Sequence, residues 1–253
     1  MSHLTGCLQL FPGVGKNKAK DLNAKGIYNW SSLLQFAKKI QIEALDFGLP
    51  NIEILEERLI ELETNFKTKN FSFFTKELGH LEYWRLWEEF SDRFCFLDIE
   101  TTGISESSYT TVASIYKNKT IQTFERGKNL EFLCEEIDPN DLLVTYNGKR
   151  FDIPFLEREF KFKFVNPHLD LMNLLHSIGI KGGLKGSEIQ LGLKRPDHLT
   201  GMEGKHAPML WFEYQNNHNR EALETLIAYN REDTINLELV LEKTILRLNP
   251  NLF

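Results

Sequence analysis

The sequence predicts an α/β fold, in which helices flank a mixed sheet, preceded by a small all-helical domain. Up to about residue 66, apolar residues recur at three- and four-residue spacing, which is typical of amphipathic helices. From residue 94, short strand-like runs replace this pattern. Three such runs are followed by alternating helical and strand-like segments, an order that favours helices packed on a mixed sheet.

The composition is that of an ordinary globular protein. The chain has 253 residues, of which 42% are hydrophobic and 26% charged, enough for one large domain or two small ones. No positively charged leader precedes a long apolar run, and no stretch approaches the ~18 apolar residues of a membrane span. We therefore expect a cytoplasmic protein without membrane contact. The three cysteines are widely spaced and form no C-x-x-C pair, so we expect them to pack in the core (Cys7, Cys95 and Cys134).

The first domain is predicted to span residues 1–68. Helical spacing is strongest over residues 31–47 and 52–66, and no strand pattern occurs there. A polar stretch around residue 68 marks the boundary. The second domain, residues 69–253, is expected to begin with a lead-in helix over 69–93, whose Trp84 and Trp87 are expected to pack in a core rather than stack on bases.

The second domain is predicted to continue with strands and helices in a definite order. Strand-like runs cover residues 93–100, 109–117, 120–127 and 142–148. Helical segments are predicted over residues 129–137, 152–160, 184–192 and about 220–248.

The first acidic motif is D-x-E in the apolar run FLDIETTG. Side chains alternate along a strand, so Asp98 and Glu100 are expected to point to the same face. Two neighbouring carboxylates repel each other, and a divalent cation relieves that repulsion. Oxygen ligands suit Mg²⁺ or Mn²⁺, and the lack of a His or Cys cluster disfavours zinc. The alternative is a strand end with two solvated acids.

Two further motifs follow in order along the chain. Asp152 stands at a predicted helix start in YNGKRFDIPFL, where an N-terminal cap is the alternative role. Tyr229 and Asp233 are four residues apart in a long helix and so share one face, although ordinary polar positions would look the same. The conjunction of the three patterns, each on the expected element, favours a catalytic site.

This combination resembles the three motifs of the DnaQ-like DEDD exonuclease superfamily in its tyrosine variant. The similarity spans residues 94 to about 245 and is greatest to YprB-type ribonuclease H-like domains, many of which have His where Tyr229 stands. The resemblance implies a ribonuclease H-like fold, 3′-to-5′ exonuclease activity and two divalent ions. Those ions would be held by four acids (Asp98, Glu100, Asp152 and Asp233).

The resemblance also implies individual roles. Asp98 would bridge the ions, Glu100 and Asp233 would hold the ion on the nucleophile side, and Asp152 would act partly through water. Tyr229 would orient the attacking water, since a phenol with a pKa near ~10 is a poor base at neutral pH. Asp170, an acid shared with many relatives, would support the centre without binding the ions. Three further residues are candidates for nucleic-acid contact (Thr101, Asn147 and Lys185), although a solvated role for Lys185 is the alternative.

The segment over residues 8–27 resembles a helix-hairpin-helix. Gly13 and Gly15 permit a tight turn, whose backbone N–H groups and following helix start could bind a phosphate. Lysines at 16, 18 and 20 (Lys16, Lys18 and Lys20) would add attraction independent of sequence. Residues 1–40 carry six lysines and one aspartate, a local charge of +5 in a chain of net charge −6. The alternatives are a plain glycine turn or a protein-contact module.

Three functions are compatible with these patterns. The leading hypothesis is a 3′-to-5′ exonuclease acting on DNA or RNA. One alternative is a non-catalytic nucleic-acid-binding module, which the presence of all four acids and Tyr229 disfavours. The other is a structure-specific endonuclease that uses the same metal chemistry.

Overall fold

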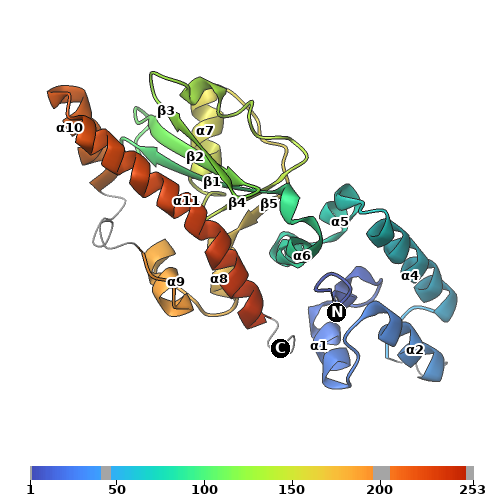
Figure 1. Cartoon of the computed structure of the whole chain (residues 1–253). Coiled ribbons are helices and arrows are strands. Elements are labelled where there is room, and N and C mark those ends of the chain that lie inside the picture. Colours follow the sequence, from blue (N-terminus) through green and yellow to red (C-terminus); the bar gives the residue numbers. More distant parts are fainter. Residues whose placement is uncertain (1, 41–46, 196–205, 249–253) are drawn as a thin grey trace. The chain divides into compact units, whose positions relative to one another are not determined.

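The computed structural model describes residues 2–40, 47–195 and 206–248, and the chain divides into two compact units, residues 1–91 and 92–253 (Figure 1). Within the described ranges, no helix is both long and apolar enough to cross a membrane.

The described part of the first unit is helical, as predicted. It begins with the 3-10 helix η1 (Leu8–Leu10), and the α-helices that follow are α1 (Lys16–Ala24), α2 (Trp30–Ile40) and α4 (Ile52–Lys67). Asn51 caps α4 by accepting a hydrogen bond from the Ile54 backbone N–H. The part of the predicted helix 31–47 that falls on residues 41–46 lies outside the described residues.

The predicted lead-in helix over 69–93 is not one helix. The segment forms α5 (Phe71–Glu77), η2 (His80–Leu86), α6 (Trp87–Phe90) and η3 (Ser91–Arg93). Leu78 and Gly79 interrupt it with extended backbone, ψ 138° and 148°. Trp84 is buried and Trp87 is half-buried. The first compact unit extends to Ser91 and so includes most of this segment, whereas the sequence placed the domain boundary after residue 68.

The second unit contains the predicted mixed sheet. Its strands are β1 (Phe94–Thr101), β2 (Thr110–Lys117), β3 (Thr120–Glu125), β4 (Leu142–Thr145) and β5 (His168–Asp170), in the order β3-β2-β1-β4-β5. β1 pairs antiparallel with β2, which pairs antiparallel with β3, while β1–β4 and β4–β5 are parallel. β1 is therefore central.

The predicted helix over 129–137 is wrong, because only the 3-10 turn η4 (Leu130–Phe132) forms there. The Asn129 side chain makes hydrogen bonds with the end of β3 instead. It accepts one from the Glu125 backbone N–H and donates one to the Thr123 carbonyl. Such side-chain bonds to backbone compete with a helix. Leu130 and Leu133 are still buried against the sheet, as a helix would have buried them.

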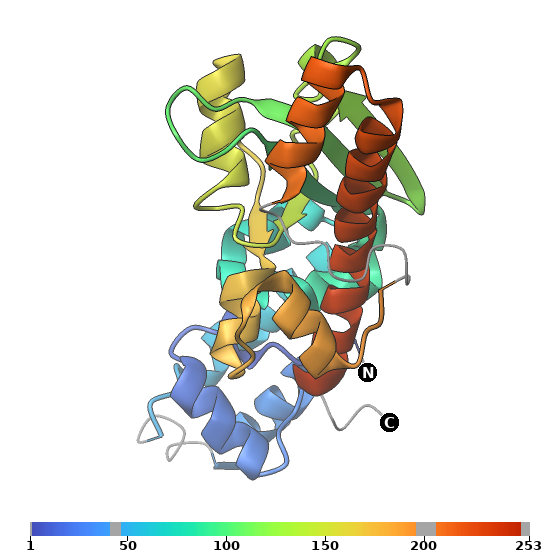
Figure 2. The same ribbon diagram turned by 90° about the vertical axis from the view of Figure 1, so that its left-hand side faces the viewer.

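Helices cover both faces of the sheet (Figures 1 and 2). On one face, Leu97 and Ile99 of β1 pack in one core cluster with Phe155 and Leu156 of α7 (Asp152–Phe160). On the other face, Val112 of β2 packs with α10 (Ala207–Asn217) and α11 (Arg220–Leu248). The remaining helices are α8 (Leu171–Ser177) and α9 (Gly183–Leu191). Neither α8 nor α10 was predicted.

Candidate metal centre

The alternation of β1 directs Asp98 and Glu100 to the face that α11 covers. Leu97 and Ile99, on the opposite face, belong to the core beneath α7. Glu100 is buried and Asp98 is partly exposed. An irregularity in the β1–β2 register after Glu100 ends the regular pairing just beyond these acids.

The middle of α11 brings a third acid to the pair on β1. Asp233 is buried, and one carboxylate oxygen from each of Asp98, Glu100 and Asp233 lies within 4.8 Å of the others. Asn230, one turn before Asp233, donates from Nδ2 to Asp98 Oδ2 at 2.8 Å and to the Asp98 carbonyl at 3.1 Å. The helix therefore supplies an acid and orients the acid opposite it.

Asp152, the fourth predicted acid, lies at the start of α7. Phe151 occupies the N-cap position without a side-chain cap, and Asp152 is the first helical residue, so the capping alternative is not what the structure shows. Its carboxyl group is buried near the β1 acids, since its charge raises the pKa values of both Asp98 and Glu100. Three of the predicted acids therefore form the cluster, and Asp152 is near enough to affect two of them, while its role in holding an ion stays a prediction.

The electrostatic environment of these acids favours binding of a cation. Burial, then the charges of neighbouring acids, raises the pKa values of Asp98 and Glu100 well above their ordinary values. Burial also raises the pKa of Asp152 to about 7, against the lowering effect of backbone N–H groups of Asp152 and Ile99. Asp233 Oδ1 is buried, and its contact with Arg195 Nη1 is an ion pair without the direction of a hydrogen bond. Oxygen ligands that are buried, crowded and incompletely hydrogen-bonded fit a hard divalent cation such as Mg²⁺ or Mn²⁺.

Arg195 and Glu188 form a buried ion pair beside Asp233. Arg195 Nη1 lies 2.5 Å from Asp233 Oδ1, and its Nε and Nη2 donate to the two oxygens of Glu188 at 2.6 and 2.8 Å. Burial raises the pKa of Asp233 to about 6, with Arg195 opposing that shift. Arg195 therefore neutralises part of the acidic cluster.

Tyr229 lies one turn before Asp233 on the same face, as predicted. Burial, followed by the charge of Asp233, raises the pKa of Tyr229, so its hydroxyl stays protonated at neutral pH. The Lys185 ammonium lies over its ring, 5.6 Å from the centroid, and the Arg195 guanidinium lies 5.9 Å from it. Lys185, in the first turn of α9, is thus close to the centre.

Asp170 shapes the turn that leads to Asp152. Its carboxylate accepts from the backbone N–H groups of Asn147, Lys149 and Met172, at 2.9, 3.1 and 3.0 Å. Asn147 takes the left-handed conformation, φ 64°. A Cβ on Gly148 would come within 2.2 Å of the Thr145 hydroxyl, so only glycine fits there.

The Thr101 hydroxyl is engaged within its own turn, because it donates to the Gly103 carbonyl at 2.8 Å. Thr101 follows Glu100 directly and is buried. It stabilises the exit from β1, and its contact with nucleic acid stays a prediction.

The helix-hairpin-helix predicted over residues 8–27 stays a prediction, because α1 follows the glycine turn but only the 3-10 helix η1 precedes it. Gly13 has a left-handed backbone conformation, φ +75°, which favours glycine. A Cβ atom at this position would lie only 3.0 Å from the Gly48 carbonyl oxygen. Gly15 is the N-cap of α1 with an ordinary φ of −80°, so the backbone does not require glycine there. Lys16 and Lys20 are exposed, whereas Lys18 donates to the Gly48 carbonyl at 2.5 Å. Two of the three lysines therefore remain directed to solvent.

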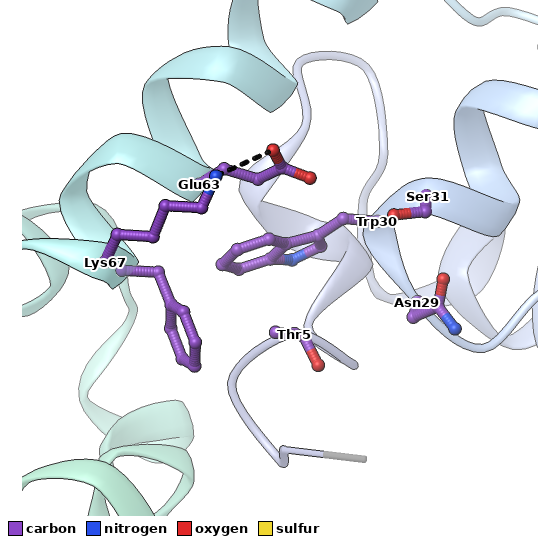
Figure 3. A pocket seen from close by; sticks show the side chains of 7 residues that line it. Thr5, Asn29, Trp30, Ser31, Glu63 and Lys67 are labelled. Atoms are coloured by element: carbon purple, nitrogen blue, oxygen red, sulfur yellow. Dashed lines mark ion pairs between the residues drawn. The ribbon is translucent and has the colours of Figure 1, made fainter.

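A pocket of about 390 Å³ lies elsewhere in the first unit (Figure 3). Its lining combines an aromatic wall with one ion pair, Lys67–Glu63 at 3.9 Å. The lining residues are Thr5, Asn29, Trp30, Ser31, Glu63, Phe66 and Lys67. The Trp30 indole already donates to the Cys7 carbonyl. No residue predicted to act in catalysis lines this pocket.

The sequence patterns did not predict a role for Asn230, Glu188 or Arg195. Asn230 and Glu188 could have been noticed, because each lies in a polar motif of a helix that carries other predicted residues. Arg195 offered no such pattern. Its two acidic partners lie on different helices, which only the tertiary fold brings together.

Comparison with known proteins defines the class. An acidic cluster at the centre of a β3-β2-β1-β4-β5 mixed sheet is the arrangement of a ribonuclease H-like fold. The family model of the RNase_H superfamily matches residues 95–245, more than half of the chain, so this protein belongs to that superfamily. The match covers the sheet except Phe94, and it includes the four predicted acids.

One solved structure that this chain matches in part is the family B DNA polymerase from the hyperthermophilic archaeon Pyrobaculum calidifontis. The two share 16% sequence identity with a TM-score of 0.47, over 59% of this chain and 24% of the polymerase chain. This chain thus corresponds to about a quarter of that protein. No curated protein matches the sequence.

Proposed function

We propose that this protein is a metal-dependent 3′-to-5′ exonuclease that hydrolyses phosphodiester bonds of DNA or RNA with two ions, Mg²⁺ or Mn²⁺. The observation that carries the proposal is the convergence of Asp98, Glu100 and Asp233, with one oxygen from each within 4.8 Å of the others. Membership of the RNase_H superfamily supports the choice of nucleic acid as substrate.

Each residue of the centre would have its own role in binding the ions or the attacking water. Asp98, Glu100, Asp152 and Asp233 would hold the ions, which supply charge stabilisation for the attacking and leaving oxygens of the displacement. The protonated Tyr229 hydroxyl would hold the attacking water by a hydrogen bond, as its raised pKa makes it a poor base. Asn230 would keep Asp98 oriented.

Substrate contact would come from basic residues beside and outside the centre. Lys185 stands over the Tyr229 ring, where its ammonium could pair with a phosphate. The hairpin in residues 1–68, through Gly13, Lys16 and Lys20, would add contact with the nucleic-acid backbone. Asn147 and Thr101 flank the acids and would contact the terminal nucleotide.

The test uses 5′-labelled linear DNA and RNA strands, incubated with the purified protein and Mg²⁺, Mn²⁺ or EDTA. A 3′-to-5′ exonuclease gives a ladder of progressively shorter labelled products, only with metal, and a blocked 3′ end slows the reaction. The matched control is Asp98→Asn, which removes one charge while keeping the shape. Cleavage of closed circular substrates would instead indicate an endonuclease, and binding without metal-dependent cleavage would indicate a non-catalytic module.

A further inference from the structure

Arg195 stands in a position that bears directly on metal binding. Its side chain is only 9% exposed, and it follows α9, which lies beside α11. Its Nη1 is 2.5 Å from Oδ1 of Asp233, one of the clustered acids. A positive charge therefore already occupies the neighbourhood in which a divalent ion would bind.

Glu188 determines where the guanidinium stands. It lies on α9 and is only 2% exposed, and its carboxylate accepts hydrogen bonds from Nε and Nη2 of Arg195. It also accepts a hydrogen bond from Asn236 of α11 at 3.2 Å. A two-point pair between a carboxylate and a guanidinium has a fixed planar geometry. Arg195 is thus anchored on one side and directed at Asp233 on the other.

The contact between Arg195 and Asp233 is close but not well directed. Nη1 and Asp233 Oδ1 are within ion-pair distance, yet neither of these buried atoms has a hydrogen-bond partner. A divalent cation stabilises such a carboxylate oxygen more than the guanidinium does, because the cation carries twice the charge and does not require an N–H group to point at the oxygen.

We propose that Arg195 and a divalent cation compete for Asp233, so that Arg195 is a positioning residue that sets the metal affinity of the centre. The inference rests on the proposed function, because competition requires that the centre binds such an ion. Glu188 moderates the competition, since its negative charge neutralises part of the guanidinium charge that faces Asp233.

Three variants give an order of affinities that general loss of stability would not produce. Arg195→Met removes the competitor, so Mn²⁺ should bind more tightly, on the order of 10-fold, the scale of supporting residues around metal ligands. Glu188→Gln leaves the guanidinium to pair with Asp233 alone, so Mn²⁺ should bind more weakly by a similar factor. The double variant, Glu188→Gln with Arg195→Met, removes both buried charges and should again bind more tightly than wild type.

The experiment measures Mn²⁺ binding to the full chain at pH 7 and fixed salt, by the electron paramagnetic resonance signal of free Mn²⁺. Thermal unfolding in EDTA checks that each variant is folded. Lys194→Met is the matched control, because it removes the same charge from the exposed neighbour and should leave affinity unchanged. If Arg195→Met alone does not fold, the double variant decides, since it does not leave Glu188 as a buried charge without its partner.

Tighter binding by the variants that lack Arg195, with weaker binding by Glu188→Gln, would support the competition. Equal or weaker binding by the variants that lack Arg195 would overturn it, while wild-type binding would leave the proposed metal centre intact. Failure of the wild-type chain to bind Mn²⁺ would overturn the metal centre and this inference with it.

Discussion

Asn230 Nδ2 donates a 2.8 Å hydrogen bond to Asp98 Oδ2, and so joins the middle of the longest described helix to the central strand of the sheet. Asn230 is fully buried, and the bond favours the charged form of Asp98, against burial and three neighbouring acids that raise its pKa. The orientation of the carboxylate expected to be shared by both ions thus depends on a residue that is not itself a ligand.

Replacing Asn230 with Ala should therefore lower metal-dependent turnover, on the order of 10- to 100-fold. The free energy of unfolding should also fall by about 1–3 kcal/mol, because Asp98 loses a buried donor. Steady-state kinetics and denaturant unfolding would measure both effects. Asn216→Ala, an exposed asparagine on α10, is the control and should change neither. Turnover equal to wild type would show that Asn230 does not orient Asp98.

Asp98→Asn and Asp233→Asn should each abolish nuclease activity while the fold remains intact. Each change removes a metal ligand and also relieves repulsion among buried acids, so metal-free thermal stability at pH 7 should hold or rise. Circular dichroism with thermal unfolding in EDTA would report stability. Metal-dependent turnover close to wild type in either variant would contradict the assigned centre.

Without metal, the free energy of unfolding should decrease as the pH rises from about 4 to about 7. The folded-state pKa values of Asp152 and Asp233 are raised to about 7 and about 6, above the ordinary 3.8, so their stabilising protonated forms are lost over this window. Urea unfolding at several pH values in EDTA would measure the slope. Mg²⁺ at pH 7 should restore stability by binding the folded state alone. A flat or rising profile would contradict the raised pKa values of these buried acids.

Tyr229→Phe should reduce turnover more than metal affinity. The lost hydroxyl would position water without binding an ion, and positioning groups of this kind contribute about 10² to 10⁴ in rate. Single-turnover kinetics, combined with Mn²⁺ titration, separates the two quantities. The control is Tyr214→Phe on α10, which keeps the ring while removing a hydroxyl away from the acids. An unchanged rate in Tyr229→Phe would exclude this tyrosine from the mechanism.

Replacing Lys16 and Lys20 with Gln should weaken nucleic-acid binding without changing turnover at saturating substrate. Both side chains are exposed, whereas Lys18 is omitted because its bond to the Gly48 carbonyl is structural. If each lysine neutralises one phosphate, the slope of the logarithm of the binding constant against the logarithm of the salt concentration should become shallower by roughly 1.4 to 1.8. Binding of labelled duplex and single strands, measured over a salt series in EDTA, would show it. An unaltered slope on both substrates would favour the protein-contact or purely structural role of the hairpin.

The sequence by itself determined what depends on local periodicity. Alternation along residues 94–101 places Asp98 and Glu100 on one face, and four-residue spacing places Tyr229 and Asp233 on one helix face. The same patterns predicted the helical first unit and the mixed sheet, both confirmed. Because these properties depend only on neighbours within one turn or one strand, they can be deduced without knowledge of the rest of the chain.

The tertiary structure alone decided how those faces meet. The backbone is extended at Leu78–Gly79. In the segment 129–137, bonds from the Asn129 side chain to the backbone compete with local helix preference. The sheet order sets β1 at the centre, where α11 can bring Asp233 to it. Arg195 contacts Glu188 and Asp233 through this packing. No sequence periodicity predicts these contacts, because a contact between separate elements depends on the free energy of the whole fold.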